Sequence, residues 1–395
     1  MKKIGIIGAG ISGLTLAWRL YQKGIKSVIF ERDWRVGGRS LYSGAVTPGK
    51  FDKNLNKLIE EFKLEEMIIP LSQKEIAFYT NEGKMIDYET FQEQMRKKFG
   101  LIKGMKLWQV FRFVNSLNFD VSQPDEKILE LRKISFSEFI KRYPSEIQEV
   151  LKATACFFGE TEIYNPKKMS AEYGLNVVRL ANELCSGRAF GFEDENILIL
   201  CDVLAKKLKE GGNEILTSCK VKLIEKKREE FIISYQKEGK EEKTKVEIVV
   251  LATPLYVTQK IFPQLKLETD IEYLPLDCYT LEGDLRYPQI KVIKGEPENP
   301  ANIAIGYNIV PTYQTFLCLE GKEPIFSLLY RDWKVISKKR IEALPVIAAK
   351  AKVPSLKTKI KGAFLCGDFY YHTFLEVAVT TAEMVAEMIV KEIEF

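Results

Sequence analysis

Three glycines, Gly8, Gly10 and Gly13, lie between an apolar strand-like run and an apolar helical pattern near the start of the chain. Gly8 permits a tight strand-to-helix turn, Gly10 leaves room for the backbone to approach a pyrophosphate, and Gly13 lets the helix lie close to the sheet. The free N–H groups at the helix start, where Ile11 and Ser12 lie, then favour bound phosphate charge. The pattern predicts a dinucleotide site.

A carboxylate at the end of the second strand-like run supports this prediction. Glu31 follows the run SVIF, about 20 residues past the glycines, where a carboxylate can accept hydrogen bonds from both ribose hydroxyls. A 2′-phosphate would be repelled there, so NADP is disfavoured. Arg32 comes next and joins the residues predicted to bind the cofactor.

The sequence Gly37-Gly38-Arg39 narrows the prediction from any dinucleotide to FAD. Two glycines bring this loop against the cofactor, and the Arg39 guanidinium can pair with pyrophosphate oxygens. With these motifs the chain resembles the flavin-containing amine oxidase superfamily, which includes protoporphyrinogen oxidases and carotenoid-type desaturases. The resemblance implies noncovalent FAD, because no attachment cysteine of the family's type is evident.

The resemblance extends to the C-terminus. It implies that Val221 contacts the adenine side through its backbone, that Ala252 returns the chain to the nucleotide domain, and that Gly367-Asp368 binds FAD. It also implies that the helix start at residues 374–378 lies beside the flavin pyrimidine, where N–H groups stabilise negative charge. The full cofactor-binding set is Gly8, Gly10, Ile11, Ser12, Gly13, Glu31, Arg32, Gly38, Arg39, Val221, Ala252, Gly367, Asp368, Glu376, Val377 and Ala378.

The positions of these motifs predict the domain organisation. Residues 1–75, 190–262 and 355–395 are expected to form a discontinuous Rossmann-like FAD-binding domain in an α/β fold. The two insertions, residues 76–189 and 263–354, are expected to pair into an α+β substrate domain. The first is largely helical by pattern, and the second is richer in aromatic and β-branched residues. We therefore expect strands and a helical lid over the flavin.

Three residues before the last helix are candidates for catalysis. The flavin is the electron sink, so the protein has to hold a C–H bond over N5 in a dry pocket. Phe374 takes the place where amine-oxidising relatives put an aromatic ring facing the flavin, and Tyr371 and His372 lie in the same connection. Two interpretations of His372 stay open: a polar contact or proton acceptor near the flavin, or a loop histidine bonded to backbone.

The lack of a lysine in one segment guides the choice of substrate class. Many amine-oxidising relatives place a lysine over the flavin from the strand after the Ala-Thr-Pro turn, whereas residues 268–289 contain no lysine. We therefore predict dehydrogenation of a bulky, largely apolar small molecule by hydride transfer to flavin N5, as in protoporphyrinogen oxidases and polyene desaturases. One alternative is a flavin amine oxidase acting on a CH–NH bond. The other is an FAD-binding protein without turnover, which the short loop after Arg39 motivates.

Composition limits the other functional classes. A net charge of +5 gives no reason to expect a nucleic-acid partner, and a single histidine excludes a multi-histidine zinc site, so no metal is expected. Seven cysteines without C-x-x-C spacing, and no secretory signal, predict reduced thiols and a cytoplasmic location. No apolar run is long enough for a transmembrane segment. The basic amphipathic segment 97–117 is either a lid helix or a peripheral membrane contact, and the oligomeric state stays open.

Overall fold

The computed structural model describes most of the chain, including every residue named above as a candidate. The described residues are 2–41, 49–70, 72–79, 84–156, 161–192, 197–286, 292–295, 304–310, 313–321, 326–328 and 330–394. Most of the short loop that follows Arg39, residues 42–48, therefore lies outside the described part.

A parallel sheet carries the N-terminal motif. Among the described residues its strand order is β17-β11-β1-β2-β7, with every neighbouring pair parallel. β1 and β11 are buried along their whole length, as parallel strands covered on both faces require. The sheet therefore joins strands from the start, the middle and the end of the chain. Its strands are β1 (Ile4–Ile7), β2 (Ser27–Phe30), β7 (Glu214–Leu216), β11 (Ile248–Leu251) and β17 (Ala363–Leu365).

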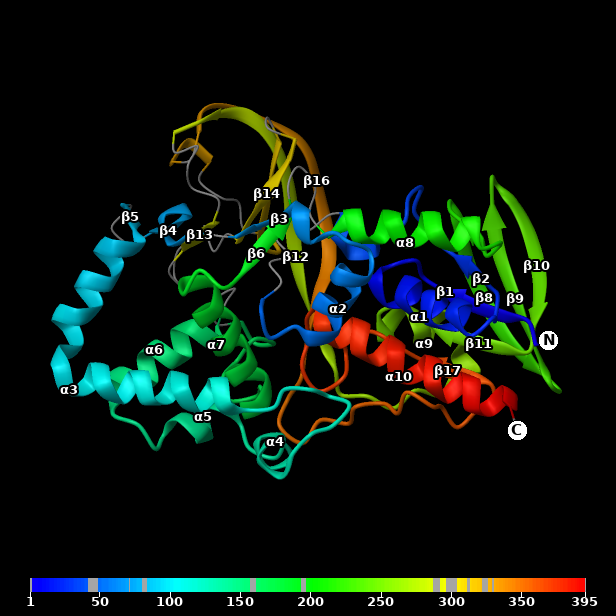
Figure 1. Cartoon of the computed structure of the whole chain (residues 1–395), viewed down its shortest axis with the longest axis horizontal. Coiled ribbons are helices and arrows are strands. Elements are labelled where there is room, and N and C mark those ends of the chain that lie inside the picture. Colours follow the sequence, from blue (N-terminus) through cyan, green and yellow to red (C-terminus); the bar gives the residue numbers. More distant parts are fainter. Residues whose placement is uncertain are drawn as a thin grey trace.

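Helices and a β-meander cover this sheet. α1 packs against both α8 and α10, and α2 packs against α10 (Figure 1). The meander lies directly on β1, because a Cβ on Gly5 would come within 2.8 Å of Ile233 Cδ1. These elements are α1 (Ile11–Gln22), α2 (Lys53–Glu61), α8 (Leu198–Glu210), α9 (Leu255–Ile261), α10 (Leu375–Glu394), β8 (Cys219–Lys227), β9 (Glu230–Lys237) and β10 (Lys240–Val246).

A second region lies beside the first, with a curved antiparallel sheet above a group of helices in Figure 1. The sheet order is β14-β15-β12-β16. Leu276 and Cys278 of β12 share a buried core with Val178 of α7, so sheet and helices pack together. The elements are α3 (Tyr88–Ser116), α4 (Glu126–Leu131), α5 (Phe136–Ile140), α6 (Ser145–Ala155), α7 (Ala171–Cys185), β12 (Glu272–Leu285), β14 (Ala304–Val310), β15 (Tyr313–Leu319) and β16 (Tyr330–Val346).

Short strands connect distant parts of the chain. β4 pairs with β5 and, in parallel, with β13, so the two insertions share a small sheet. β3 pairs with β6. These strands and the short 3-10 helices are β3 (Ile68–Pro70), β4 (Ile76–Tyr79), β5 (Met85–Asp87), β6 (Phe190–Phe192), β13 (Val292–Gly295), Gly38–Leu41, Glu65–Met67, Gln73–Glu75, Pro263–Leu265 and Phe326–Leu328.

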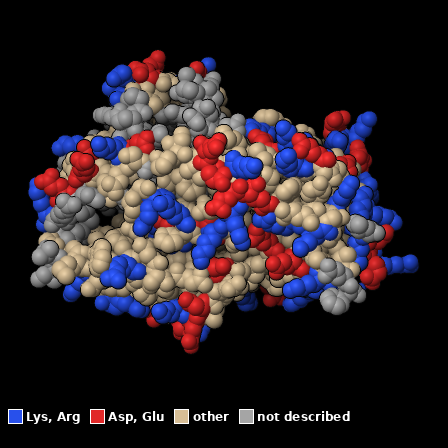
Figure 2. Space-filling view, viewed as in Figure 1, with Lys and Arg blue, Asp and Glu red and all other residues tan. Residues whose placement is uncertain are grey.

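The basic amphipathic segment lies in α3, which is interrupted at Gly100. Val110 and Val114 are buried in the helical core, whereas Met105 and Trp108 are each 58% exposed. Acidic and basic side chains are interspersed on the face that Figure 2 shows. None of the described helices has the length and apolar character that a membrane crossing needs.

Two glycines in the helical region should respond oppositely to alanine. A Cβ on Gly174 in α7 would lie 2.3 Å from Phe136 Cδ2, whereas one on Gly104 in α3 would meet no atom within 4 Å. We expect Gly174→Ala to destabilise the protein by roughly 1–3 kcal/mol through overpacking, and Gly104→Ala to stabilise it by about 0.5–1 kcal/mol through helix propensity. Thermal or urea unfolding measures both. Equal effects of the two variants would contradict this packing of α5 on α7.

Candidate flavin site

Two glycine loops meet above the carboxyl end of β1. The Gly37 N–H donates to the Ala9 carbonyl at 2.9 Å, and a Cβ on Gly38 would lie only 3.1 Å from Gly10 Cα. Gly38 has φ +58°, which glycine adopts without strain. The contact between Gly10 and Gly38, called the glycine contact below, therefore depends on the absence of a side chain at Gly38. The backbone at Gly10, before the start of α1, stays half-buried and partly accessible.

The N-terminus of α1 is suited to an anion. Gly10 is its N-cap residue, no side chain caps the helix, and its first turn holds no acidic residue. Backbone N–H groups at such a terminus need partners, and a phosphate supplies them. Gly13 lets the helix approach β1, since a Cβ there would lie 2.0 Å from the Gly8 carbonyl oxygen. Phosphate groups of a dinucleotide fit this terminus.

Glu31 lies beside these loops and is buried. One carboxylate oxygen accepts the Ala9 N–H at 2.8 Å and the other accepts the Asp33 N–H at 2.9 Å. Burial raises the pKa of Glu31, although the two backbone donors oppose that rise. Each oxygen keeps capacity for a ribose hydroxyl. Arg32 instead has a side chain that is 60% exposed and lies 3.6 Å from the Asp33 carboxylate.

The start of β8 is held beside Glu31. The Cys219 N–H donates to the Glu31 carbonyl at 2.7 Å, and Val221, two residues later, is buried at a bulge in the β8–β9 pairing. On the other side, Ala252 joins β1 through an N–H bond to the Ile7 carbonyl, at 2.9 Å. Val221, predicted to contact the adenine side, and Ala252, predicted to return the chain to the nucleotide domain, thus lie on either side of the β1 turn.

Arg39 and Asp368 form an ion pair. The guanidinium lies 2.6 Å from the Asp368 carboxylate, although sequence reasoning assigned both residues separately to FAD. Gly367 is fixed by Thr381, whose hydroxyl accepts the Gly367 N–H and donates to its carbonyl, both at 3.0 Å. The pair brings the loop after β2 to the end of β17. Asp368 is therefore placed to orient Arg39.

The connection between β17 and α10 contains two residues in the left-handed region. Tyr371 has φ +65° and Phe374 has φ +97°, which is costly for residues other than glycine. The Arg132 guanidinium covers the Tyr371 ring at 3.5 Å. Phe374 is half-buried and packs against the helical core. The strained connection therefore spans from the parallel sheet to the helical region.

His372 is buried and bonded through both ring nitrogens. Nε2 lies 2.7 Å from the Phe119 carbonyl, and Nδ1 lies 3.1 Å from the Asn176 side-chain amide. Burial lowers the pKa of His372 to about 4, so the ring is neutral at pH 7. Nε2–H then donates to Phe119 and Nδ1 accepts from Asn176. This arrangement fits the interpretation of His372 as a loop histidine bonded to backbone.

Glu376 connects α10 to α2. Its carboxylate accepts the N–H groups of Asn54 at 2.9 Å and Leu55 at 2.8 Å. Burial raises the pKa of Glu376 to about 7, with the nearby Asp52 carboxylate adding to the rise. The next two residues, Val377 and Ala378, are buried. These hydrogen bonds therefore fix the start of α10, which the resemblance places beside the flavin, against α2.

Sequence reasoning missed a group of buried polar side chains on α7. Asn176, Arg179 and Glu183 are all at least nine-tenths buried. The Arg179 guanidinium lies 3.9 Å from Asp52, at the start of α2. Polar residues at helical spacing, within the segment predicted to be largely helical, were the available signal.

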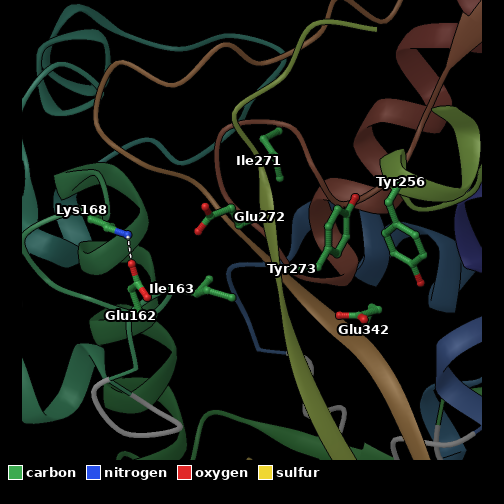
Figure 3. A pocket seen from close by; sticks show the side chains of 8 residues that line it. All are labelled: Glu162, Ile163, Lys168, Tyr256, Ile271, Glu272, Tyr273 and Glu342. Carbon is green, nitrogen blue, oxygen red and sulfur yellow. Dashed lines mark hydrogen bonds and ion pairs between the residues drawn. The ribbon is translucent and has the colours of Figure 1, made fainter. Parts of the chain in front are cut away.

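An open cleft of about 620 Å³ lies between the two regions (Figure 3). Tyr273 of β12 and Tyr256 of α9 line it, with their rings 5.3 Å apart and edge to face. Burial and then the Asp368 carboxylate raise the pKa of Tyr273, so the cleft borders the Arg39–Asp368 pair. None of the sequence-predicted site residues lines it.

A family model described as FAD dependent oxidoreductase matches residues 3–352. The chain belongs to this family. FAD is its cofactor, and the predictions of an oxidoreductase and of an α/β FAD-binding fold are confirmed. The glycine contact, the uncapped α1 terminus and the Glu31 carboxylate are the parts of the structure that fit this flavoenzyme's cofactor.

Among individual proteins, the sequence match covers only a short segment of the chain, and the structural matches cover nearly all of it at low sequence identity. The chain is 34% identical over 127 residues to protoporphyrinogen oxidase 2 of Arabidopsis thaliana, across 27% of this chain and 25% of that protein. Its fold is similar to a CLA-producing fatty acid isomerase from P. acnes (TM-score 0.71, 13% identity, 99% and 98% coverage). It is also similar to cyclohexylamine oxidase from Brevibacterium oxydans IH-35A (TM-score 0.66, 13% identity, full coverage of both chains). These structural matches show the fold of the flavoenzyme.

Replacing Glu31 should weaken FAD binding. Glu31→Ala removes the acceptor of two ribose hydrogen bonds, so we expect a loss of roughly 1.5–3 kcal/mol, or about ten- to hundredfold in FAD affinity. Titration of FAD into apoprotein measures the change. Glu214→Ala, an exposed acid-to-alanine change on β7, is the matched control. Unchanged FAD retention in Glu31→Ala would place the ribose elsewhere.

Alanine at Gly10 and Gly13 should separate cofactor binding from folding. A Cβ on Gly10 would lie 3.8 Å from its nearest neighbour within the protein, so apo Gly10→Ala should unfold near the wild-type temperature and yet lose FAD affinity. Gly13→Ala would collide with the Gly8 carbonyl and should lower the unfolding temperature of the apoprotein. Calorimetry of the apoproteins measures the unfolding temperatures, and FAD titration measures the affinities. Full FAD affinity in Gly10→Ala would mean that the pyrophosphate does not approach Gly10.

Proposed function

We propose that this flavoenzyme dehydrogenates a bulky, largely apolar small molecule, with hydride transfer to flavin N5. The observation that carries the proposal is the position of Phe374, held in a strained conformation at the start of α10 and against the helical core. An apolar ring there excludes water from the region where the resemblance places the flavin. β12 follows the FAD-binding segment 190–262 in the chain. It carries no lysine of the kind that many amine-oxidising relatives place over the flavin from this strand.

When bound, FAD supplies the acceptor for an electron pair. The chain has to hold the cofactor and orient the substrate. The α1 terminus and the Arg39 guanidinium, oriented by Asp368, would hold the phosphates, Glu31 would hold the ribose, and the α10 terminus would present N–H groups to the flavin. Phe374 and the β12 side chains would then orient the substrate and exclude water.

Oxidation of a CH–NH bond is the second candidate. It is favoured by the carboxylates of Asp52, Glu183 and Glu376, which lie near the start of α10 and would attract an amine. A similar solved structure is named a cyclohexylamine oxidase. A third alternative is an FAD-binding protein without turnover.

Anaerobic reduction of the bound flavin distinguishes these candidates. Protoporphyrinogen IX, a polyene and cyclohexylamine would each be mixed with the oxidised protein while flavin absorbance is followed. The proposal predicts that one of the two bulky compounds bleaches the flavin faster than cyclohexylamine. Faster reduction by cyclohexylamine would favour the second candidate. No reduction by any of the three would favour a protein without turnover.

Truncation of Phe374 should affect turnover more than cofactor binding. We expect Phe374→Ala to keep its FAD and to reduce the flavin more slowly, on the order of tenfold, because the substrate loses its orientation over the cofactor. FAD content and the rate of flavin reduction are the measurements. Phe113→Ala, which is also partly buried against the helical core, is the matched control. Loss of FAD, or a wild-type rate, in Phe374→Ala would remove this residue from the substrate cavity.

A further inference from the structure

The C-terminal half of α3 has apolar side chains on two opposite sides, and only one side is buried. Val110 and Val114 lie in the helical core, and Leu107 and Phe111 pack partly against it. Their 3-1-3 spacing puts these four residues on one side of the helix, facing inward. This inward side alone provides the apolar packing that holds α3 on the rest of the protein.

The opposite side of α3 carries two large apolar side chains in solvent. Met105 and Trp108 lie three residues apart, so they are neighbours on the helix surface, and each is 58% exposed. The backbone beside them is open too, because a Cβ on Gly104 would meet no atom within 4 Å. Packing within the protein therefore does not account for these two side chains. The outer face, as this side is called below, consists of Gly104, Met105, Trp108, Gln109 and Arg112, all exposed.

Positive charge is concentrated in this part of the chain. Residues 94–119 contain six lysines and arginines and no acidic residue, in a chain whose net charge is +5. Lys106 is exposed beside the outer face, and Arg112 is exposed on it. Lys97, earlier in α3, is exposed as well and pairs with Glu93 at 2.8 Å. The segment thus holds more positive charge than the net excess of the whole chain, so its partner has to be anionic.

A cation and an aromatic ring lie side by side on the outer face. The Arg112 guanidinium carbon is 4.8 Å from the centroid of the Trp108 ring, which is a cation–π distance. Such a pair combines an apolar body with a charged end. Tryptophan rings and long basic side chains of this kind favour the boundary between water and hydrocarbon, where the cation can reach lipid phosphates.

The combination of charge and apolar surface distinguishes the possible partners. A second copy of the chain would bring the same positive charges together, which is unfavourable. A nucleic acid would neutralise the charge but leave Met105 and the Trp108 ring in water. An anionic lipid surface accommodates both, because its phosphates attract the cations and its interface accepts apolar side chains.

We propose that the outer face of α3 docks on an anionic lipid surface. Met105 and Trp108 enter the interface between headgroups and acyl chains, and Lys106 and Arg112 lie against lipid phosphates. In Figure 1, α3 forms the end of the molecule opposite both chain termini, where a flat surface can reach it. The helix lies in the plane of the interface, since α3 has neither the length nor the apolar character to cross a membrane. The inference is independent of the proposed dehydrogenation, because it uses no residue of the cofactor site.

Binding of the holoenzyme to lipid vesicles tests the proposal. Vesicles of phosphatidylcholine alone would be compared with vesicles of equal parts phosphatidylcholine and phosphatidylglycerol, in a sedimentation assay. At low salt we expect at least about tenfold tighter binding to the anionic vesicles. Most of this preference should disappear at an ionic strength of about 0.5 M, because salt screens the charges. Equal binding to both kinds of vesicle, or binding to neither, would overturn the proposal.

Removal of the Trp108 ring tests its insertion into the interface. Trp108→Ala should weaken binding to the anionic vesicles on the order of tenfold and leave the unfolding temperature unchanged, because the ring is exposed. Trp333→Ala, which removes a 39% exposed ring from β16, is the matched control and should bind as the wild type does. Brominated acyl chains should quench tryptophan fluorescence in the wild type but not in Trp108→Ala. Equal vesicle binding by the two variants, or equal quenching in Trp108→Ala and the wild type, would contradict the proposal.

Removal of charge tests the contact with lipid phosphates. The double variant Lys106→Gln and Arg112→Gln should bind anionic vesicles more weakly at low salt, on the order of twentyfold. Lys206→Gln with Lys209→Gln is the matched control, because it removes two exposed cations from another helix, α8, and it should keep the wild-type affinity. A DNA duplex distinguishes the other anionic partner. DNA binding as tight as vesicle binding, lost in the α3 double variant and kept in Trp108→Ala, would indicate a nucleic-acid surface and overturn the lipid proposal.

Discussion

The glycine contact is the constraint on which the site depends. Gly10 and Gly38 approach so closely that a side chain at Gly38 would press on the partner backbone. The approach requires α1 to leave β1 without delay, and Gly13 allows this by touching the Gly8 carbonyl. It also requires the loop after β2 to return across the turn, which the Gly37 hydrogen bond to Ala9 fixes. The contact thereby brings Gly38, and with it Arg39, next to the uncapped terminus of α1.

The N-terminal part of the site could be predicted because the residues that indicate it lie close together in the sequence. The turn at Gly8 lies within one short strand-helix-strand unit, and Glu31 and the Gly38-Arg39 loop follow its second strand within residues 31–39, so the residue types determine much of the local geometry. The C-terminal Asp368 was also predicted, but only through the family resemblance. Its ion pair with Arg39 could not be foreseen from either motif, because it depends on how β17 joins the distant edge of the sheet.

The substrate side was harder to predict for a physical reason. Helical spacing places Asn176 and Glu183 on one face of α7, but it does not tell whether that face meets solvent, core or ligand. Burial, the contact of Glu183 with Gly49, and the bond from His372 to Asn176 all come from tertiary packing. For the same reason, the sequence left the role of His372 open. Its neutral, doubly bonded ring connects α7 to the strained connection before α10 and so links the helical region to the cofactor side.

The most direct test of the account is the absorption spectrum of the purified protein before and after denaturation. We expect flavin bands in the native protein and release of free FAD on unfolding, since the glycine contact and Glu31 are predicted to hold the cofactor without a covalent bond. Colourless protein that gains no flavin spectrum when FAD is added would contradict it. So would protein whose flavin stays attached to the denatured chain.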